Sequence, residues 1–205
     1  MLSKLVGLAT MTARDHEPPR RRRRADAQRS RSAVLTAAAQ VLGTHPEAGL
    51  DDVAKAAGVS RQTVYAHFGS RESLVDAVLD HVTSEVVAAM DAAAIDGEAA
   101  ETTLLRLLDA SRSAAQRHPL LLQDSRISAE RSRDLHRPIM SRFTEVIERA
   151  QREGEFTDRQ PSTWLASAII SLAHTAAELA GTGQLDAQAA DAALHTGIRR
   201  LIRPD

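Results

Sequence analysis

Residues 52–75 read DVAKAAGVSRQTVYAHFGSRESLV, and this stretch decides the fold. A helix over about Leu50 to Ala57 is expected to end at Gly58, because a helix C-terminus favours a residue that adopts the left-handed conformation without steric cost. Ser60 is the expected N-cap of a second helix, since its hydroxyl can accept a hydrogen bond from a free backbone N–H in the first turn. The sequence therefore predicts a helix-turn-helix whose second helix runs from about Arg61 to Phe68.

The second helix of this motif is polar, with Val59, Val64 and Phe68 as the apolar anchors that can hold it to a domain. A helix with an exposed polar row can enter the major groove of DNA. The N-terminus of a helix also favours phosphate. A buried amphipathic helix is the alternative, and it does not account for five hydrogen-bonding side chains within eight residues. Those side chains belong to Arg61, Gln62, Thr63, Tyr65 and His67.

Apolar stripes at helical spacing predict further helices on both sides of the motif, and no segment alternates as a strand does. The fold class is therefore all-α. One helix is expected from Ser32 to about Gly43, and another from Ser70 to beyond Val82. A weak stripe over 123–137 predicts a short helix, followed by a loop before Ile139. The remaining expected helices lie around 104–111, 139–150, 162–180 and 187–203.

Composition excludes several functional classes. The chain has no cysteine, so it has neither disulfides nor thiolate chemistry. Its eight histidines do not show a His-x-x-x-His or Glu-x-x-His spacing, and it lacks a glycine-rich phosphate loop. We therefore expect no catalytic residue, no metal and no cofactor, and an enzyme is disfavoured. The apolar runs are far shorter than the roughly 20 residues of a membrane helix, and no export signal is evident, which favours a cytoplasmic protein.

The N-terminal segment is strongly basic. Residues 1–35 hold nine Lys and Arg against three Asp and Glu, so the remaining residues carry a net charge of −7. Blocks of like charge are typical of disordered tails, and Arg20 to Arg24 follow two prolines. We expect residues 1–28 to form a disordered tail. It is either a solvated tail or an arm that neutralises DNA phosphates. Met11 is as plausible a start as Met1.

The stretch from Asp52 to Val75 strongly resembles the DNA-binding domain of tetracycline-repressor-type (TetR) regulators. The resemblance rests on the turn AGVS at 57–60, the segment TVY at 63–65, the pair HF at 67–68 and the start SRE at 70–72, all in family order. It covers about residues 29–82. The resemblance implies a three-helix DNA-binding domain at 29–82, with its motif at 49–68. A helical effector-binding and dimerisation domain at 83–205 would follow.

The resemblance also implies roles for single residues. Tyr65, His67 and Arg71 would contact phosphates. Arg61, Gln62 and Thr63 would face base edges, which agrees with the pairing of Arg with guanine, of Gln with adenine and of a Thr methyl with thymine.

Two positions depart from the family pattern. Gly49 stands where many members have a threonine cap, although glycine is a tolerable cap. Asp51 lies where some relatives touch DNA, and its negative charge predicts no phosphate contact.

For the C-terminal half, the resemblance implies a repressor that a small-molecule effector releases from a palindromic DNA operator. The last two helices are rich in alanine, which predicts a homodimer through them, whereas an ordinary monomer core is the alternative. A protein-interaction scaffold without DNA readout is the second reading of the whole chain. Few aromatic residues favour a small or aliphatic effector. The candidate pocket residues, each also compatible with a plain core role, are Leu104, Leu108, Ser111, Leu121, Phe143, Trp164 and His174.

Overall fold

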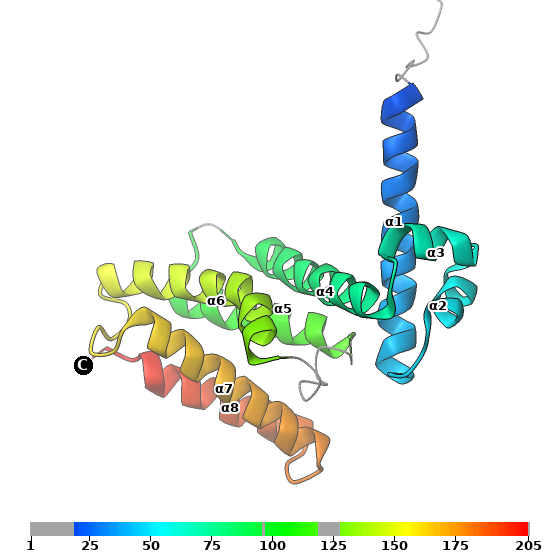
Figure 1. Ribbon diagram of the computed structural model, residues 1–205. Helices are drawn as coiled ribbons and strands as arrows, with labels where there is room; N and C mark the ends of the chain where they lie inside the picture. Colours follow the sequence, from blue (N-terminus) through cyan, green and yellow to red (C-terminus); the bar gives the residue numbers. More distant parts are fainter. Residues whose placement is uncertain (1–18, 96, 119–127, 205) are drawn as a thin grey trace, which may run out of the picture.

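The computed structural model describes residues 19–95, 97–118 and 128–204, and these residues form eight helices and no strand (Figure 1). The all-α fold class is therefore confirmed. Among the described residues, no helix has the length and apolar character needed to cross a membrane. The helices are α1 (Pro19–Thr44), α2 (Leu50–Ala57), α3 (Arg61–Phe68), α4 (Arg71–Ala93), α5 (Ala100–Gln116), α6 (Ala129–Arg152), α7 (Ser162–Gly181) and α8 (Ala187–Ile202).

Helices α1 to α3 and the first half of α4 enclose one hydrophobic core. Val34 of α1, Val53 of α2 and Val78 of α4 are completely buried in it. Of the three anchors expected for α3, Val64 and Phe68 are buried there, and Val59 is half-buried against the same core. This small domain stands at one end of the molecule, with α1 rising along it (Figure 1).

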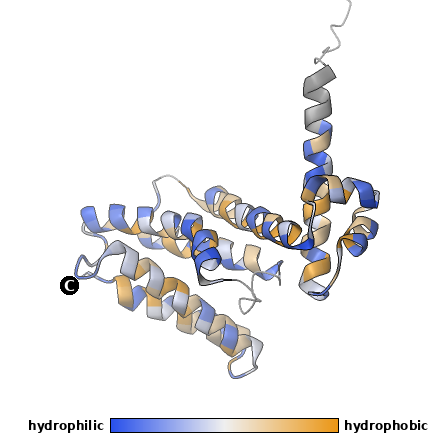
Figure 2. Ribbon diagram, in the orientation of Figure 1, coloured by the Kyte–Doolittle hydropathy of each residue, from blue (hydrophilic) through white to orange (hydrophobic). Residues whose placement is uncertain are grey.

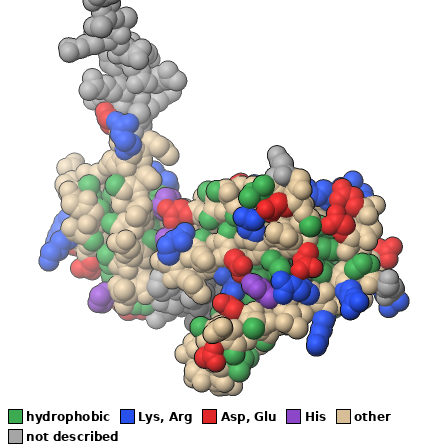
Figure 3. Space-filling view, turned by 180° about the vertical axis from the view of Figure 1, so that it is seen from behind, with side chains coloured by type: hydrophobic (Ala, Val, Ile, Leu, Met, Phe, Trp, Pro, Cys, Tyr) green, Lys and Arg blue, Asp and Glu red, His purple; other side chains and the backbone are tan. Residues whose placement is uncertain are grey.

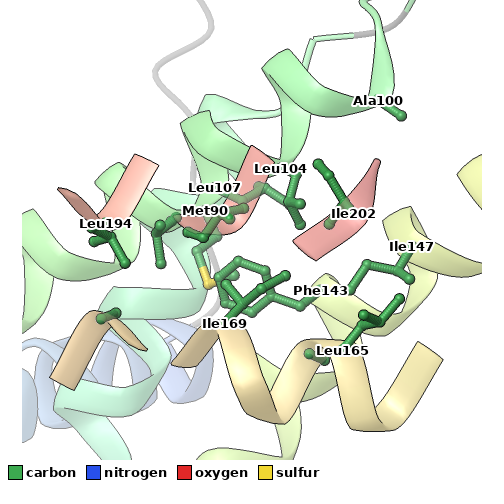
Figure 4. Packing of buried hydrophobic residues seen from close by; sticks show 14 of the residues in the cluster. Met90, Ala100, Leu104, Leu107, Phe143, Ile147, Leu165, Ile169, Leu194 and Ile202 are labelled. Atoms are coloured by element: carbon green, nitrogen blue, oxygen red, sulfur yellow. The ribbon is translucent and has the colours of Figure 1, made fainter. Parts of the chain in front are cut away.

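Helices α5 to α8 and the second half of α4 enclose a second, larger core. Figure 4 shows side chains from these helices converging, with Phe143 of α6 close to Met90 and Ile169. Apolar residues face inward and hydrophilic residues face outward along the helices (Figure 2). Acidic and basic side chains are interspersed over the outer face drawn in Figure 3, as is typical of a solvated surface. Hydrogen bonding from Arg142 of α6 lowers the pKa of Asp91 of α4.

Helix α4 belongs to both cores. Leu74 and Val78 in its first half are buried in the small domain, and Val86 and Met90 in its second half are buried in the large one. Its start is capped by the Ser70 hydroxyl, which accepts a hydrogen bond from the backbone N–H of Ser73 at 3.2 Å. The two domains are therefore joined by one continuous helix.

The N-terminal boundary differs from the prediction. Disorder was expected over residues 1–28, but residues 19–28 form the start of α1, while residues 1–18 lie outside the described part of the chain. Arginine is a good helix former, and proline is tolerated in the first turn of a helix. Intrinsic helix propensity therefore accounts for the longer helix at a point where charge alone favoured disorder.

The prediction of a loop before Ile139 is also wrong, because α6 continues through Pro138. An interior proline removes one backbone hydrogen bond and kinks or weakens the helix. On one side of Pro138, the Ser128 hydroxyl caps the helix by accepting from the N–H of Arg131 at 3.2 Å. On the other side, Phe143 and Ile147 are completely buried. The sequence pattern divides this region into two helices, but tertiary packing keeps it as one.

We predict that Leu104→Ala lowers the free energy of unfolding by about 2 to 5 kcal/mol, because Leu104 is completely buried in the large core. Ile95→Ala is the matched control, since Ile95 is 48% exposed and its truncation should change stability by less than about 0.5 kcal/mol. Urea unfolding followed by circular dichroism measures both. Equal effects of the two substitutions would contradict this assignment of the core.

Candidate nucleic-acid interface and internal cavity

The turn between α2 and α3 has the geometry that the sequence predicts. Gly58 has φ 66° and ψ 28°, which is the left-handed region that glycine occupies without strain. The Ser60 hydroxyl accepts a hydrogen bond from the backbone N–H of Thr63 at 3.1 Å, so it caps α3. Termination of one helix and initiation of the next therefore take three residues, and they set the angle at which α3 leaves the domain.

Helix α3 presents its polar residues to solvent and its apolar residues to the core. Arg61, Gln62 and Tyr65 are exposed, the last by 51%, whereas Thr63 and His67 are half-buried. The Thr63 and Ser60 hydroxyl oxygens are 2.8 Å apart. All five predicted contact residues of this helix therefore reach the surface at least in part, and three of them are exposed.

Arg61 has a partner that the sequence did not indicate. Its Nη1 lies 2.8 Å from Oδ2 of Asp51, on α2, and the two side chains are 73% and 43% exposed. The other carboxylate oxygen of Asp51 is buried and has no hydrogen-bond partner. The acidic side chain for which we expected no phosphate contact therefore binds the first residue of α3.

The start of α2 is stabilised without the hydroxyl cap that Gly49 lacks. The N–H of Gly49 donates to Oδ2 of Asp52 at 2.9 Å, which is the reciprocal half of a capping box. Asp51 and Asp52 also place negative charge in the first turn, where the helix dipole favours it. The carboxylates of Asp51 and Asp52 thus stabilise the start of α2 in the absence of a threonine cap.

Arg71, at the start of α4, has a structural role beside the predicted phosphate contact. Its Nε donates to the carbonyl of Ala48 at 3.1 Å, and its Nη2 donates to the carbonyl of Pro46. Both carbonyls lie in the loop between α1 and α2, so Arg71 ties this loop to α4. Its Nη1 makes neither bond. Beside it, hydrogen bonds from the backbone and from Ser70 lower the pKa of Glu72.

A cavity of about 150 Å³ lies inside the large domain, between α4, α5, α6 and α7. Four of the predicted pocket residues line it: Leu108, Ser111, Phe143 and His174.

Two of the predicted pocket residues do not line this cavity. Leu104 is completely buried one helical turn from Leu108, where the core is closed. Trp164 is 51% exposed near the start of α7 and faces solvent instead. Leu121 lies outside the described residues. Location in a central helix therefore did not predict which side chains line the cavity.

Sequence reasoning missed wall residues on all four helices, and α6 shows why, because only its Phe143 was predicted. Ser132, His136, Ile139 and Phe143 recur at intervals of three and four, which places them on one face of a helix. Because the sequence pattern was divided at Pro138, this face was not visible as a unit. No group of three or more metal-binding side chains occurs among the described residues.

Part of the small domain is similar to a known family of proteins. The model for "Bacterial regulatory proteins, tetR family" matches residues 34–78, which span the core of the small domain and α3. The HTH-type transcriptional repressor LfrR of Mycolicibacterium smegmatis is 38% identical over 82 residues. That alignment covers 40% of this chain and 43% of LfrR, so the chain spans less than half the length of this relative.

Solved structures extend the likeness to the whole fold. The structure of LfrR from Mycobacterium smegmatis in complex with proflavine has a TM-score of 0.64 and 27% identity, and the match covers 86% of this chain and 98% of that one. A putative TetR-family regulator from Rhodococcus sp. has a TM-score of 0.70 and 22% identity, over 84% of this chain and 98% of that one, and it supports the fold alone. The helix-turn-helix over the matched residues 34–78 is therefore similar to that of the tetR family of bacterial regulatory proteins, and the fold of the described chain is similar to that of LfrR.

Proposed function

We propose that this protein is a transcriptional repressor that binds a palindromic DNA operator and is released from it by a small-molecule effector. The observation that carries the proposal is the polar surface of α3, which projects from a domain that buries Val64 and Phe68 of the same helix. A protein-interaction scaffold would not need this polar row, and an enzyme would need a catalytic constellation. The proposed site of action is the cytoplasm.

For DNA contact, we assign Gln62, Thr63 and Arg61 to base edges, and Tyr65 and His67 to phosphates. Gln62 and Tyr65 are exposed, so both can reach DNA without rearrangement of the domain. Arg61 would bring its guanidinium to a base edge from its position beside Asp51. The similarity to LfrR, which is described as a repressor, supports the direction of control.

A homodimer through α7 and α8 would present two copies of α3 to two half-sites, as a palindrome requires. These two helices pack side by side (Figure 1). Leu172 of α7 is 38% exposed, and its Cδ1 lies 3.9 Å from where a Cβ on Gly197 of α8 would stand. Ala192 and Ala193 of α8 are exposed as well. Small residues and an exposed leucine together support close approach of a second copy.

The cavity in the large domain is the proposed effector site, and α6 connects it to the small domain. Residues of α6 line the cavity, while Arg131 near its start lies 2.7 Å from Oδ1 of Asp80 and donates to the backbone carbonyl of Asp76 at 3.1 Å. Both aspartates belong to the first half of α4. An effector that shifts α6 would therefore also move the half of α4 that packs against the DNA-binding helices.

We predict that Gln62→Ala weakens binding to an operator selected from a random library by about 5- to 150-fold, the loss of one good base contact. Tyr65→Phe should weaken binding by about fivefold, because it removes one hydrogen bond. Electrophoretic mobility shift measures both. Gln184→Ala is the control, since Gln184 is exposed in the turn between α7 and α8. If both α3 variants bind as tightly as this control, α3 does not read the operator.

For Arg71, we predict two separable effects. Arg71→Ala should lower the free energy of unfolding by about 1.5 to 3 kcal/mol, because two loop carbonyls lose a charged donor. It should also reduce the slope of log affinity against log salt by about one, if Nη1 binds a phosphate. Arg71→Lys keeps the charge, so it should preserve the slope while losing stability. An unchanged slope in Arg71→Ala would leave the residue only its structural role.

The dimer is tested by Leu172→Arg. A charge in the centre of the proposed interface should convert the protein to a monomer in sedimentation velocity, and it should reduce operator affinity as well. Ile95→Arg is the matched control, because Ile95 is an exposed hydrophobic residue beyond the end of α4. A Leu172→Arg protein that remains dimeric places the interface elsewhere.

A further inference from the structure

The ionisable side chains in the described wall of the cavity are all basic. Helices α5, α6 and α7 each contribute a side chain that is cationic or can accept a proton, namely Arg112, His136 and His174. Among the described residues that line the cavity, none is an aspartate or a glutamate. Such a wall can compensate a buried negative charge, whereas a buried positive charge would find no partner.

Arg112 offers a donor that the protein leaves unpaired. Its Nη2 donates to Asp191 at 2.6 Å, and its Nη1 lies 3.8 Å from Asp109. Its Nε is buried and has no hydrogen-bond partner. An unsatisfied buried donor is unfavourable. Arg112 also lines the cavity, so an acceptor brought to this wall would meet a guanidinium that Asp191 holds in place.

His136 is oriented for the same task. Its Nδ1 lies 2.7 Å from the carbonyl oxygen of Ser132, so Nδ1 donates and Nε2 is left for another partner. The ring of His174 stands nearly perpendicular to it, with the two centroids 6.3 Å apart.

Size and apolar lining limit the rest of the ligand. The cavity measures about 150 Å³, and most of its surface comes from side chains such as Val86, Leu108, Ile139 and Phe143. An engineered apolar cavity of about this volume holds a benzene molecule. The enclosed part of the ligand is therefore about one ring or a short alkyl chain.

We propose that the cavity binds a small apolar carboxylic acid, a single aromatic ring or a short alkyl chain that carries one carboxylate. The proposal rests on the effector function assigned above, because it names the chemical class of that effector. The carboxylate lies toward Arg112 and His136, and the ring or chain lies against Ile139 and Phe143.

Three probes with the same ring and different charge test the proposal: benzoate, benzyl alcohol and benzylamine. We expect benzoate to raise the thermal unfolding temperature of the full chain and to bind at least tenfold more tightly than benzylamine in isothermal titration calorimetry. Benzyl alcohol should bind more weakly than benzoate. Benzylamine or benzyl alcohol binding as tightly as benzoate overturns the proposal, as does the absence of benzoate binding at about 10 mM.

Variants locate the binding. Arg112→Gln and His136→Gln should each weaken benzoate binding about tenfold and leave benzyl alcohol binding unchanged, because only the charged group loses a partner. Arg106→Gln on the same helix is the control, since Arg106 pairs with Glu98 outside the cavity. Ala173→Phe fills the cavity and should abolish binding of both probes. Benzoate binding that is insensitive to Arg112→Gln, His136→Gln and Ala173→Phe overturns the proposal, even if one variant folds poorly.

Operator release separates this proposal from the effector function itself. If benzoate binds in the cavity without releasing the selected operator, the chemistry of the cavity stands and the effector function fails. If benzylamine releases the operator and Ala173→Phe abolishes that release, the effector function stands and the carboxylate proposal fails.

Discussion

The structure depends on a single helix that is buried at both ends in different cores. Helix α4 packs Leu74 and Val78 among the helices of the small domain and Val86 and Met90 among the helices of the large domain. A helix of 23 residues is stiff, because its backbone hydrogen bonds form along its whole length. Neither core can shift relative to the other without tilting this helix or breaking it. The orientation of α3 is therefore set partly by packing that occurs far from it.

The second half of this helix and α6 enclose the cavity together with α5 and α7. Arg131 of α6 reaches back to Asp80 of α4, so the wall of the cavity and the small domain share a polar contact as well as a helix. These side chains are partly exposed, and an isolated pair of this kind adds little to stability. The pair instead couples the two helices, because a movement of α6 would pull on the first half of α4.

Features that depend on residues close together in the sequence could be predicted, whereas those that depend on distant residues could not. The turn at Gly58 and the cap at Ser60 are local features, so the helix-turn-helix and the exposed row on α3 could be predicted from their residues. The bonds of Arg71 to the loop before α2, and of Arg61 to Asp51, join side chains that only the folded domain brings together. The cavity wall was harder still, because the continuity of α6 depends on packing around Pro138. Trp164 shows the same limit, since its exposure is decided by the neighbours of α7 and not by its own hydrophobicity.

The pairing of Asp51 with Arg61 has a consequence for how the protein searches a chromosome. A carboxylate beside the recognition helix is repelled by phosphates, and this repulsion weakens binding to every sequence alike. In the proposed complex, a base that shares the Arg61 guanidinium with Asp51 would offset this loss at the operator alone. The pair would then lower the occupancy of random DNA more than that of the operator. The ratio of specific to nonspecific affinity, which governs occupancy in a genome, would rise accordingly.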